Sequence, residues 1–409
     1  MVHRQYVTCA LTYDLVVSWD AELTALTTRI ADPLFTRPEP REAFADLVRA
    51  LLADVPRKNS WQLADHIGHA TAHRFEHLLD RAKWDVDALR DEVRSYVIAH
   101  LGRADGVLIA DDTVAIKKGE MSVGVAEQYC GLTGQVENCQ VMPMLTYASE
   151  AGHAFVNRRL YLPESWAHDT GRRGRAGVPE HVVFRTKPQL VIDMLTEELA
   201  AGTPFRYLCA DSGYGRDPHL RAFCHERQIS YVMAVPIDLP LVAVRGGVEP
   251  AGHVLDRLLA LGRAGIWERR SCGAGTKGLR VYDWTAVSAA VAGQAPAPGY
   301  AHTLLIRRSV TAPLEVEFFL AHAPTGTSVS ELIEAAGMRW KIEENNEHGK
   351  DLLGLTSYQV RKWTPWHRHV TIAMLALAFL AVTRAALPAP ADETAGGGKD
   401  RPLLEASAG

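Results

Sequence analysis

Residues 205–236 read FRYLCADSGYGRDPHLRAFCHERQISYVMAVP, and the pattern within this stretch indicates the fold class. The apolar and aromatic run at 205–211 predicts a strand, 218–227 predicts a helix, and 230–236 predicts a second strand. Strands that alternate with helices are typical of an α/β sheet covered by helices.

The segments that precede this stretch complete the expected sheet. Runs rich in β-branched and aromatic residues predict strands in succession, and one further run predicts a helix. The strands are expected at 106–111, 122–131, 138–148 and 153–162, and the helix at 188–201. We therefore predict an α/β fold with a mixed sheet flanked by helices.

The chain divides by composition into regions around this sheet. Residues 1–100 carry amphipathic runs that predict a helical N-terminal region, and 101–236 hold the first part of the sheet domain. Residues 237–327 are Gly-rich and strand-leaning, and helical patterns resume over 328–385. The Pro/Gly/Ala-rich tail at 386–409 is expected to be disordered.

Composition limits the classes of protein that fit. The 409 residues carry a formal net charge of −4 and an estimated pI of 6.5, so any surface that holds nucleic acid must be local. The six cysteines lack CxxC or metal-finger spacing, which indicates thiols in a reducing cytosol. The apolar run at 370–382 predicts a buried core helix rather than a membrane segment, and the N-terminus lacks a signal-peptide pattern.

The segment 57–85 leaves two interpretations open. It predicts a short helix, a His/Gly break and a second helix that offers Arg74, His77 and Arg81. This pattern suits a helix-turn-helix that reads DNA. Two packed helices with solvated charges suit it equally well.

Two expected strands end in a carboxylate. Asp111, or its neighbour Asp112, ends the run at 106–111, and Asp211 ends the run at 205–211. Reactive groups in open α/β sheets gather outside the carboxyl ends of strands, although a single aspartate there is more often a turn or cap residue. Two such strands in one sheet favour a site for oxygen-preferring Mg²⁺ or Mn²⁺.

The stretch RWKIEENNEHGKDLLG, which begins at Arg339, supplies a third carboxylate. At about 100° per residue, Arg339, Glu343 and Lys350 lie within roughly 60° of one another on one helix face. Glu344 lies about 100° away from Glu343, so the geometry favours Glu343 for a site. A surface i,i+4 ion pair between Arg339 and Glu343 is the alternative.

Longer segments carry a family resemblance that extends, in order, over roughly residues 50–385. They include DDTVAIKKGEMSVGVAEQYCGLTGQVENCQV (111–141), RRLYLPESW (158–166), FRTKPQL (184–190), ADSGYGRDPHLR (210–221), RWKIEENNEHGKDLLGL (339–355) and YQVRKWTPWHRHVTIAMLALAFLAV (358–382). The chain resembles bacterial insertion-sequence transposases with an RNase H-like DDE catalytic domain. The resemblance is strongest to the insertion-sequence family seven-hundred-and-one.

The resemblance implies a set of catalytic, metal-binding residues. Asp111 fits the first aspartate of a D-x-T pattern, and a shift of one residue would place Asp112 there instead. Asp211 and Glu343 would complete the set, which would hold two Mg²⁺ or Mn²⁺ ions. The family's R-x3-E-x6-K signature is matched by Arg339, Glu343 and Lys350, whereas Ala336 stands where the wider class has a tyrosine.

The resemblance also implies the DNA contacts. Arg339, Lys350 and the pair Lys117-Lys118 would hold DNA phosphates. Asp211 and Glu343 lie 132 residues apart, so 237–327 would be a β-rich insertion domain that covers flanking DNA. Two tryptophans of that region are candidates to stack on a flipped base, or else are core residues: Trp267 and Trp284.

We therefore expect a cytoplasmic, nucleoid-associated transposase that acts on double-stranded DNA as a homodimer, without a membrane partner. It would cut the inverted-repeat ends of its element and join the 3′-OH ends to target DNA. The alternatives are an RNase H-like nuclease without strand transfer and a domesticated DNA-binding regulator.

Overall fold

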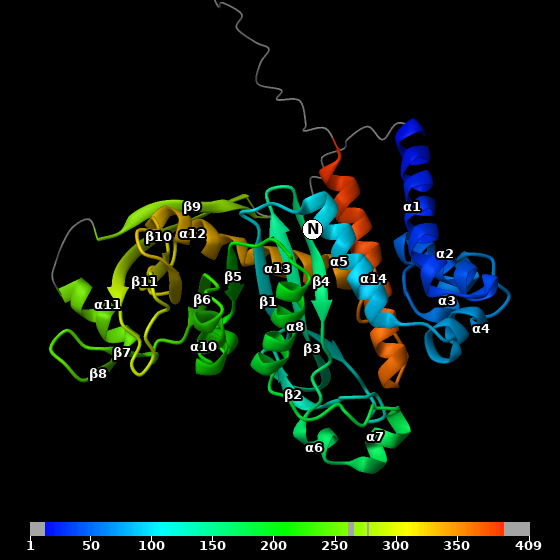
Figure 1. The fold of residues 1–409 in the computed structure, drawn as a ribbon, viewed down its shortest axis with the longest axis horizontal. Helices are drawn as coiled ribbons and strands as arrows, with labels where there is room; N and C mark the ends of the chain where they lie inside the picture. The colour runs from blue at the N-terminus through cyan, green and yellow to red at the C-terminus, as the bar shows by residue number, and fades with distance from the viewer. Residues whose placement is uncertain (1–12, 261–265, 276–277, 388–409) are drawn as a thin grey trace, which may run out of the picture.

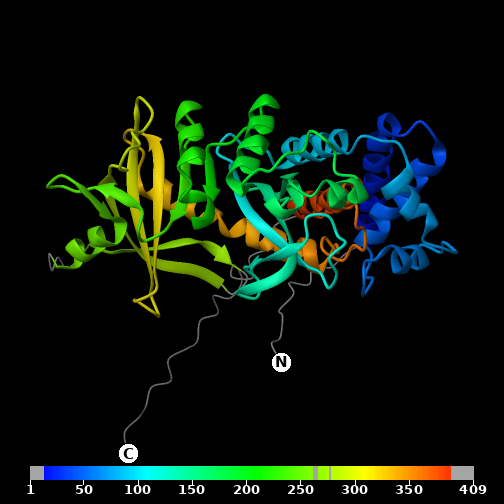
Figure 2. The same cartoon turned by 90° about the horizontal axis from the view of Figure 1, so that it is seen from below.

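The protein is described by a computed structural model over residues 13–260, 266–275 and 278–387. In both Figure 1 and Figure 2, helices of the N-terminal region lie at one end and strands β9–β12 at the other. The two parallel strands β1 and β5 lie between these ends. The disordered tail predicted at 386–409 falls, from residue 388 onward, outside the described residues.

One long mixed sheet forms the centre of the protein. Its strand order is β2-β3-β1-β5-β6-β12-β11-β10-β9, and β4 also pairs with β3. Strands β1, β5 and β6 are parallel, and the other pairs are antiparallel. The bounds are β1 Val107–Ile116, β2 Ala126–Cys130, β3 Gln135–Ser149, β4 Gly152–Arg158, β5 Tyr207–Ala210, β6 Tyr231–Val235, β9 Glu268–Gly275, β10 Gly278–Ala289, β11 Tyr300–Ser309 and β12 Val316–Pro324. The predicted mixed α/β sheet is confirmed.

Strand β1 differs in length from its parallel neighbour. It pairs with β5 only over residues 107–110, but it pairs with β3 along all ten residues to Ile116. The first four residues of β1 are buried, as are all four of β5. Beyond Ala110, therefore, β1 continues while β5 ends, and the sheet opens beside the second half of β1.

Helices cover the sheet on both faces. Helices α5 and α14 pack on β4 and on each other. Helix α8 packs on β3 and on α10. The bounds are α5 Val86–Leu101, α6 Glu164–Ala167, α7 Thr170–Ala176, α8 Lys187–Ala200, α9 Ser212–Gly215, α10 Pro218–Glu226 and α14 Trp363–Ala385. Helix α14 is long and apolar enough to cross a membrane, but most of it is buried within the protein. The predicted core helix is confirmed.

The N-terminal region is helical, with α1 Tyr13–Leu34, α2 Pro38–Leu52, α3 Ser60–His66, α4 His73–Glu76 and a π-helical turn η1 at His77–Arg81. Within the segment that suits a helix-turn-helix, Arg74 is engaged by the protein. Its Nη2 lies 2.9 Å from Glu42 Oε2 on α2. Helix α4 is therefore joined to α2 by an ion pair.

The helical pattern that resumes at residue 328 is interrupted in the structure. Helix α12 spans Val329–Met338 and α13 spans Trp340–Asp351. Arg280 of β10 donates through Nη2 to the carbonyl oxygen of Gly337, at 3.0 Å, and to that of Cys272, at 2.9 Å. Because the Gly337 carbonyl is bound from outside the helix, the break follows from a tertiary contact that local periodicity does not encode.

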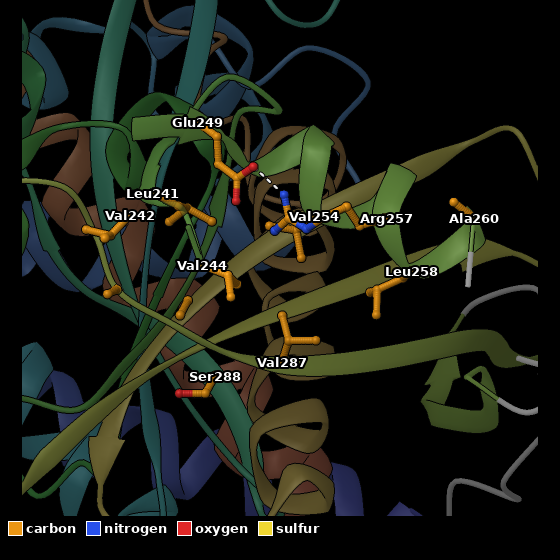
Figure 3. A pocket seen from close by; sticks show the side chains of 12 residues that line it. Leu241, Val242, Val244, Glu249, Val254, Arg257, Leu258, Ala260, Val287 and Ser288 are labelled. Carbon is orange, nitrogen blue, oxygen red and sulfur yellow. Dashed lines mark hydrogen bonds and ion pairs between the residues drawn. The ribbon is translucent and has the colours of Figure 1, made fainter. Parts of the chain in front are cut away.

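The region 237–327 shares the central sheet, because β12 pairs with β6. It also holds a small hairpin, β7 Pro240–Val242 with β8 Val248–Pro250, and helix α11 Ala251–Ala260. A mostly apolar pocket of about 460 Å³ lies between these elements and β10 (Figure 3). Trp284 is only 1% exposed, as the core interpretation of that residue requires.

Helix α9 packs so closely on β6 that one position excludes any side chain. A Cβ atom at Gly215 would lie 1.9 Å from the carbonyl oxygen of Ala234. We expect Gly215→Ala to lower the free energy of unfolding by about 3 kcal/mol, the upper end for overpacking. Urea titration followed by circular dichroism measures the loss.

Gly174 provides the matched control, because it lies inside α7 and a Cβ there would meet no atom within 4 Å. Gly174→Ala should leave stability unchanged or raise it by up to about 1 kcal/mol. Equal effects of the two substitutions would contradict the close packing of α9 on β6.

Candidate active site

Asp111 and Asp211 occupy matching positions on the parallel strands β1 and β5. Ala110 pairs with Ala210, so the two aspartates follow in register where β5 ends. Asp211 caps α9, since its Oδ1 accepts from Tyr214 N at 3.1 Å. The prediction that Asp111 or Asp112 ends its strand is wrong, because pairing with β3 continues β1 to Ile116. The register with β5 still brings Asp111 next to Asp211, which does follow the end of its strand.

Burial and mutual repulsion make this carboxylate pair unfavourable when both groups are charged. Burial, and next the charge of Asp211, raise the pKa of Asp111 to about 7. Burial also raises the pKa of Asp211, and the charge of Asp112 adds to it. The Arg339 guanidinium opposes both shifts. Neighbouring carboxylates of this kind gain most from a bound cation.

Asp112 has different surroundings from Asp111. Its Oδ2 accepts from Lys187 Nζ and its Oδ1 accepts from the Tyr214 hydroxyl, each at 2.6 Å. Both oxygens of Asp112 are therefore engaged by the protein. Sequence reasoning assigned no role to Lys187 or Tyr214, although both lie in segments that carry the family resemblance, FRTKPQL and ADSGYG.

Helix α13 presents Glu343 between two basic residues. Arg339 Nη2 lies 3.2 Å from Glu343 Oε1, the i,i+4 pair that the sequence allowed. Burial raises the pKa of Glu343, and the charges of Arg339 and Arg280 oppose that shift. Burial lowers the pKa of Lys350, and the charge of Asp111 is among those that oppose it. Arg339 and Lys350 thus both lie within electrostatic range of Asp111.

The residues that follow Glu343 anchor α13 to the sheet. Glu344 Oε2 lies 3.0 Å from His153 Nε2 and 3.0 Å from Lys341 Nζ. Asn345 is fully buried and donates to Thr146 Oγ1 at 3.0 Å. Glu344 therefore points to β4, and Glu343 is left on the face that carries Arg339.

The donor set fits an oxygen-preferring divalent cation in part. Asp111 and Asp211 are adjacent, partly buried and destabilised as anions, which suits Mg²⁺ or Mn²⁺. The Oδ1 atom of Asn346 on α13 is also buried, and it has no hydrogen-bond partner in the described structure. However, the described ranges contain no group of three His, Cys, Asp or Glu residues arranged to hold one ion. Glu343 is therefore not gathered with the two aspartates here.

The two lysines expected to hold phosphates differ in their surroundings. Lys117 Nζ lies 3.2 Å from the Tyr358 carbonyl oxygen and 3.7 Å from the centre of the Tyr358 ring. Burial lowers the pKa of Lys117 to about 8. Lys118 is exposed. The Lys117 ammonium is therefore engaged within the protein, whereas Lys118 faces solvent.

Two comparisons relate this chain to known proteins. It matches the family described as DDE superfamily endonuclease over residues 32–254, which is more than half of the chain and includes both aspartates. It is also similar to a protein of Microchaete diplosiphon named probable transposase for insertion sequence element IS701, with 26% identity over 196 residues. That match covers 47% of this chain and 48% of the relative, so the chain spans about half of the relative's length.

The adjacent glutamates should respond differently to the same substitution. Hydrogen bonds from His153 and Lys341 outweigh burial and lower the pKa of Glu344 to about 2. Glu344→Gln should therefore lower the free energy of unfolding at pH 7 by about 2–3 kcal/mol, since it removes the carboxylate that accepts from His153 and Lys341. Glu343→Gln should not destabilise the fold, because burial opposes its charge.

Chemical denaturation of the two variants at pH 7 measures this difference. The stabilisation from Glu344 is present above pH 4.5 and is lost as the pH falls toward 2, so the variants should converge in acid. A larger loss of stability in Glu343→Gln than in Glu344→Gln would refute these assignments.

Asp111 should destabilise the protein when no cation is bound. Its pKa is higher in the folded protein than in the unfolded chain, so stability is lost as the pH rises from 3.8 to about 7. A shift of three pKa units corresponds to about 4 kcal/mol. In EDTA at pH 8, Asp111→Asn should be more stable than the wild type by up to about this amount.

Thermal unfolding with and without MnCl₂ completes the test. The ion should raise the Tm of the wild type but not that of Asp111→Asn. Asp105→Asn, which alters an exposed carboxylate just before β1, should behave as the wild type does. A less stable Asp111→Asn protein in EDTA would show that Asp111 is not strained.

Proposed function

Because this chain belongs to the DDE superfamily endonuclease family, we propose that it is a metal-dependent DNA transposase. It cuts the inverted-repeat ends of an insertion sequence and joins each 3′-OH end to target DNA. One observation carries the proposal: two partly buried aspartates lie in register on adjacent parallel strands where β5 ends, beside a helix that bears a glutamate and a lysine and is capped by an arginine. The similarity to a probable insertion-sequence transposase supports it.

In this proposal Asp111, Asp211 and Glu343 hold the ions. Two bound divalent ions would lower the pKa of an attacking water or 3′-OH and stabilise the leaving oxygen. The Asp111 and Asp211 carboxylates are already held together by the pairing of β1 with β5. Glu343 would have to turn away from Arg339 to join them, because Arg339 is its present partner.

The surroundings of Asp112 favour Asp111 as the first ligand. Both oxygens of Asp112 are occupied, by Lys187 and by Tyr214. A cation bound to Asp112 would have to displace one of them, whereas Asp111 gains from any cation that offsets Asp211.

The DNA contacts follow from the positions of the basic residues. Arg339 and Lys350 flank Glu343 on α13, so both would bind phosphates of the strand that enters the site. Lys118 would add a contact at the end of β1, while Lys117 would not. We further propose that the helical N-terminal region binds the inverted repeats and that two copies pair the element ends as a homodimer in the cytoplasm.

Two alternative functions make different predictions from this proposal. A nuclease of the same fold would cut DNA without joining it. A domesticated regulator would bind DNA without cutting it, and the retained carboxylates Asp111, Asp211 and Glu343 weigh against that rival.

The test uses duplex oligonucleotides taken from the DNA that borders the gene, with Mg²⁺ or Mn²⁺. The wild type should nick these ends and join pre-cleaved 3′-OH ends to a plasmid. Asp111→Asn, Asp211→Asn and Glu343→Gln should each reduce both reactions by at least about 100-fold while DNA binding persists. Gel analysis of labelled ends measures cutting and joining separately.

Asp105→Asn is the matched control and should retain both activities. Cutting without joining of pre-cleaved ends would favour the nuclease. An Asp211→Asn protein that cleaves as well as the wild type would refute the catalytic assignment. A wild type that binds these duplexes but cuts none of them would favour the regulator.

A further inference from the structure

Lys187 lies beside the carboxylate site, although it belongs to a different segment of the sequence from each of the three proposed ligands. It is the first residue of α8, and its Nζ lies 2.6 Å from Asp112 Oδ2. Burial alone would lower the pKa of Lys187, but the charges of Asp112 and Asp211 outweigh it and raise the pKa. The ammonium is therefore a fixed positive charge within range of the second strand-end aspartate.

This ammonium has capacity for a further ligand. A lysine ammonium has three N–H donors, and among the described residues only Asp112 accepts from Lys187 Nζ. The Lys187 side chain is 39% exposed, more than the 22% of Asp112. Two donors therefore remain available to a group that enters from solvent.

The contacts of Asp112 fix where this ammonium lies. Tyr214, which is buried, donates to the other oxygen of Asp112 at 2.6 Å. Tyr214 N also binds Asp211 Oδ1, so one residue sets the position of both carboxylates. A free lysine side chain loses rotamer entropy when a ligand immobilises it. Holding Lys187 in place beforehand reduces that cost.

We propose that Lys187 binds a non-bridging oxygen of the DNA phosphate that enters the carboxylate site, and that Asp112 and Tyr214 are positioning residues for it. This inference rests on the proposed function, because it takes DNA as the substrate. It adds a phosphate contact from α8, which is a different segment of the chain from the α13 contacts. It also gives Asp112 a role that is separate from metal binding.

The alternative is an ion pair that only stabilises the fold. A partly exposed pair of that kind contributes little to stability. It would not alter how DNA binding depends on salt. Binding and stability must therefore be measured on the same variants.

The experiment compares Lys187→Met with Arg227→Met, which removes an exposed charge at the C-cap of α10, near the amino end of β6. Binding to the bordering-DNA duplexes is measured against salt in the Glu343→Gln background. Lys187→Met should reduce the slope of log K against log salt by about one, and Arg227→Met should not. In the active protein, Lys187→Met should slow cleavage by about 100-fold.

A chemically altered duplex locates the contact. A neutral methylphosphonate at the scissile position and Lys187→Met should each weaken binding, and together they should weaken it no more than one alone. Lys187→Arg, which retains the charge, should recover part of the lost binding. Additive losses would overturn the proposed contact.

Asp112→Asn separates positioning from metal binding. It should reduce cleavage less than Asp111→Asn does and should keep the rise in Tm with MnCl₂. Loss of that rise would make Asp112 a metal ligand and overturn the inference. The inference would also be overturned if Lys187→Met lowered the Tm but left the dependence of DNA binding on salt unchanged. If Asp211→Asn also cleaves normally, the proposed function itself fails instead.

Discussion

The main constraint on this structure is that the fold holds two carboxylates side by side against their mutual repulsion. Parallel pairing of β1 with β5 sets Asp111 and Asp211 side by side at the point where β5 ends. Burial and the neighbouring charge then raise the pKa of Asp111 to about 7. This raised pKa costs the folded protein free energy at neutral pH, which would be unusual in a fold without a function for the pair. Positive charge surrounds the two carboxylates, from Arg339, Lys187 and Lys350.

Adjacent residues in this site have opposite tasks because of backbone geometry. On a strand, successive side chains point to opposite sides, so Asp111 meets Asp211 while Asp112 meets Lys187. On a helix, successive residues differ by about 100°, so Glu343 meets Arg339 while Glu344 meets His153. The two members of each pair therefore face different surroundings.

Tight packing around α9 connects these tasks. Gly215 lets α9 approach β6, which places Tyr214 where its backbone meets Asp211 and its hydroxyl meets Asp112. The contact spans 102 residues of sequence between Tyr214 and Asp112. Such a contact exists only once β1, β5 and β6 have assembled.

The sequence by itself determined the mixed α/β class, the buried C-terminal helix and the different directions of Glu343 and Glu344, because these depend on side-chain periodicity along each segment. Only the tertiary structure decided that Arg280 interrupts the helix at Gly337, that Lys117 turns inward to Tyr358, and that Lys187 reaches Asp112. These contacts join segments dozens to hundreds of residues apart. Their geometry is set by strand register and helix packing, which no local pattern of residues specifies.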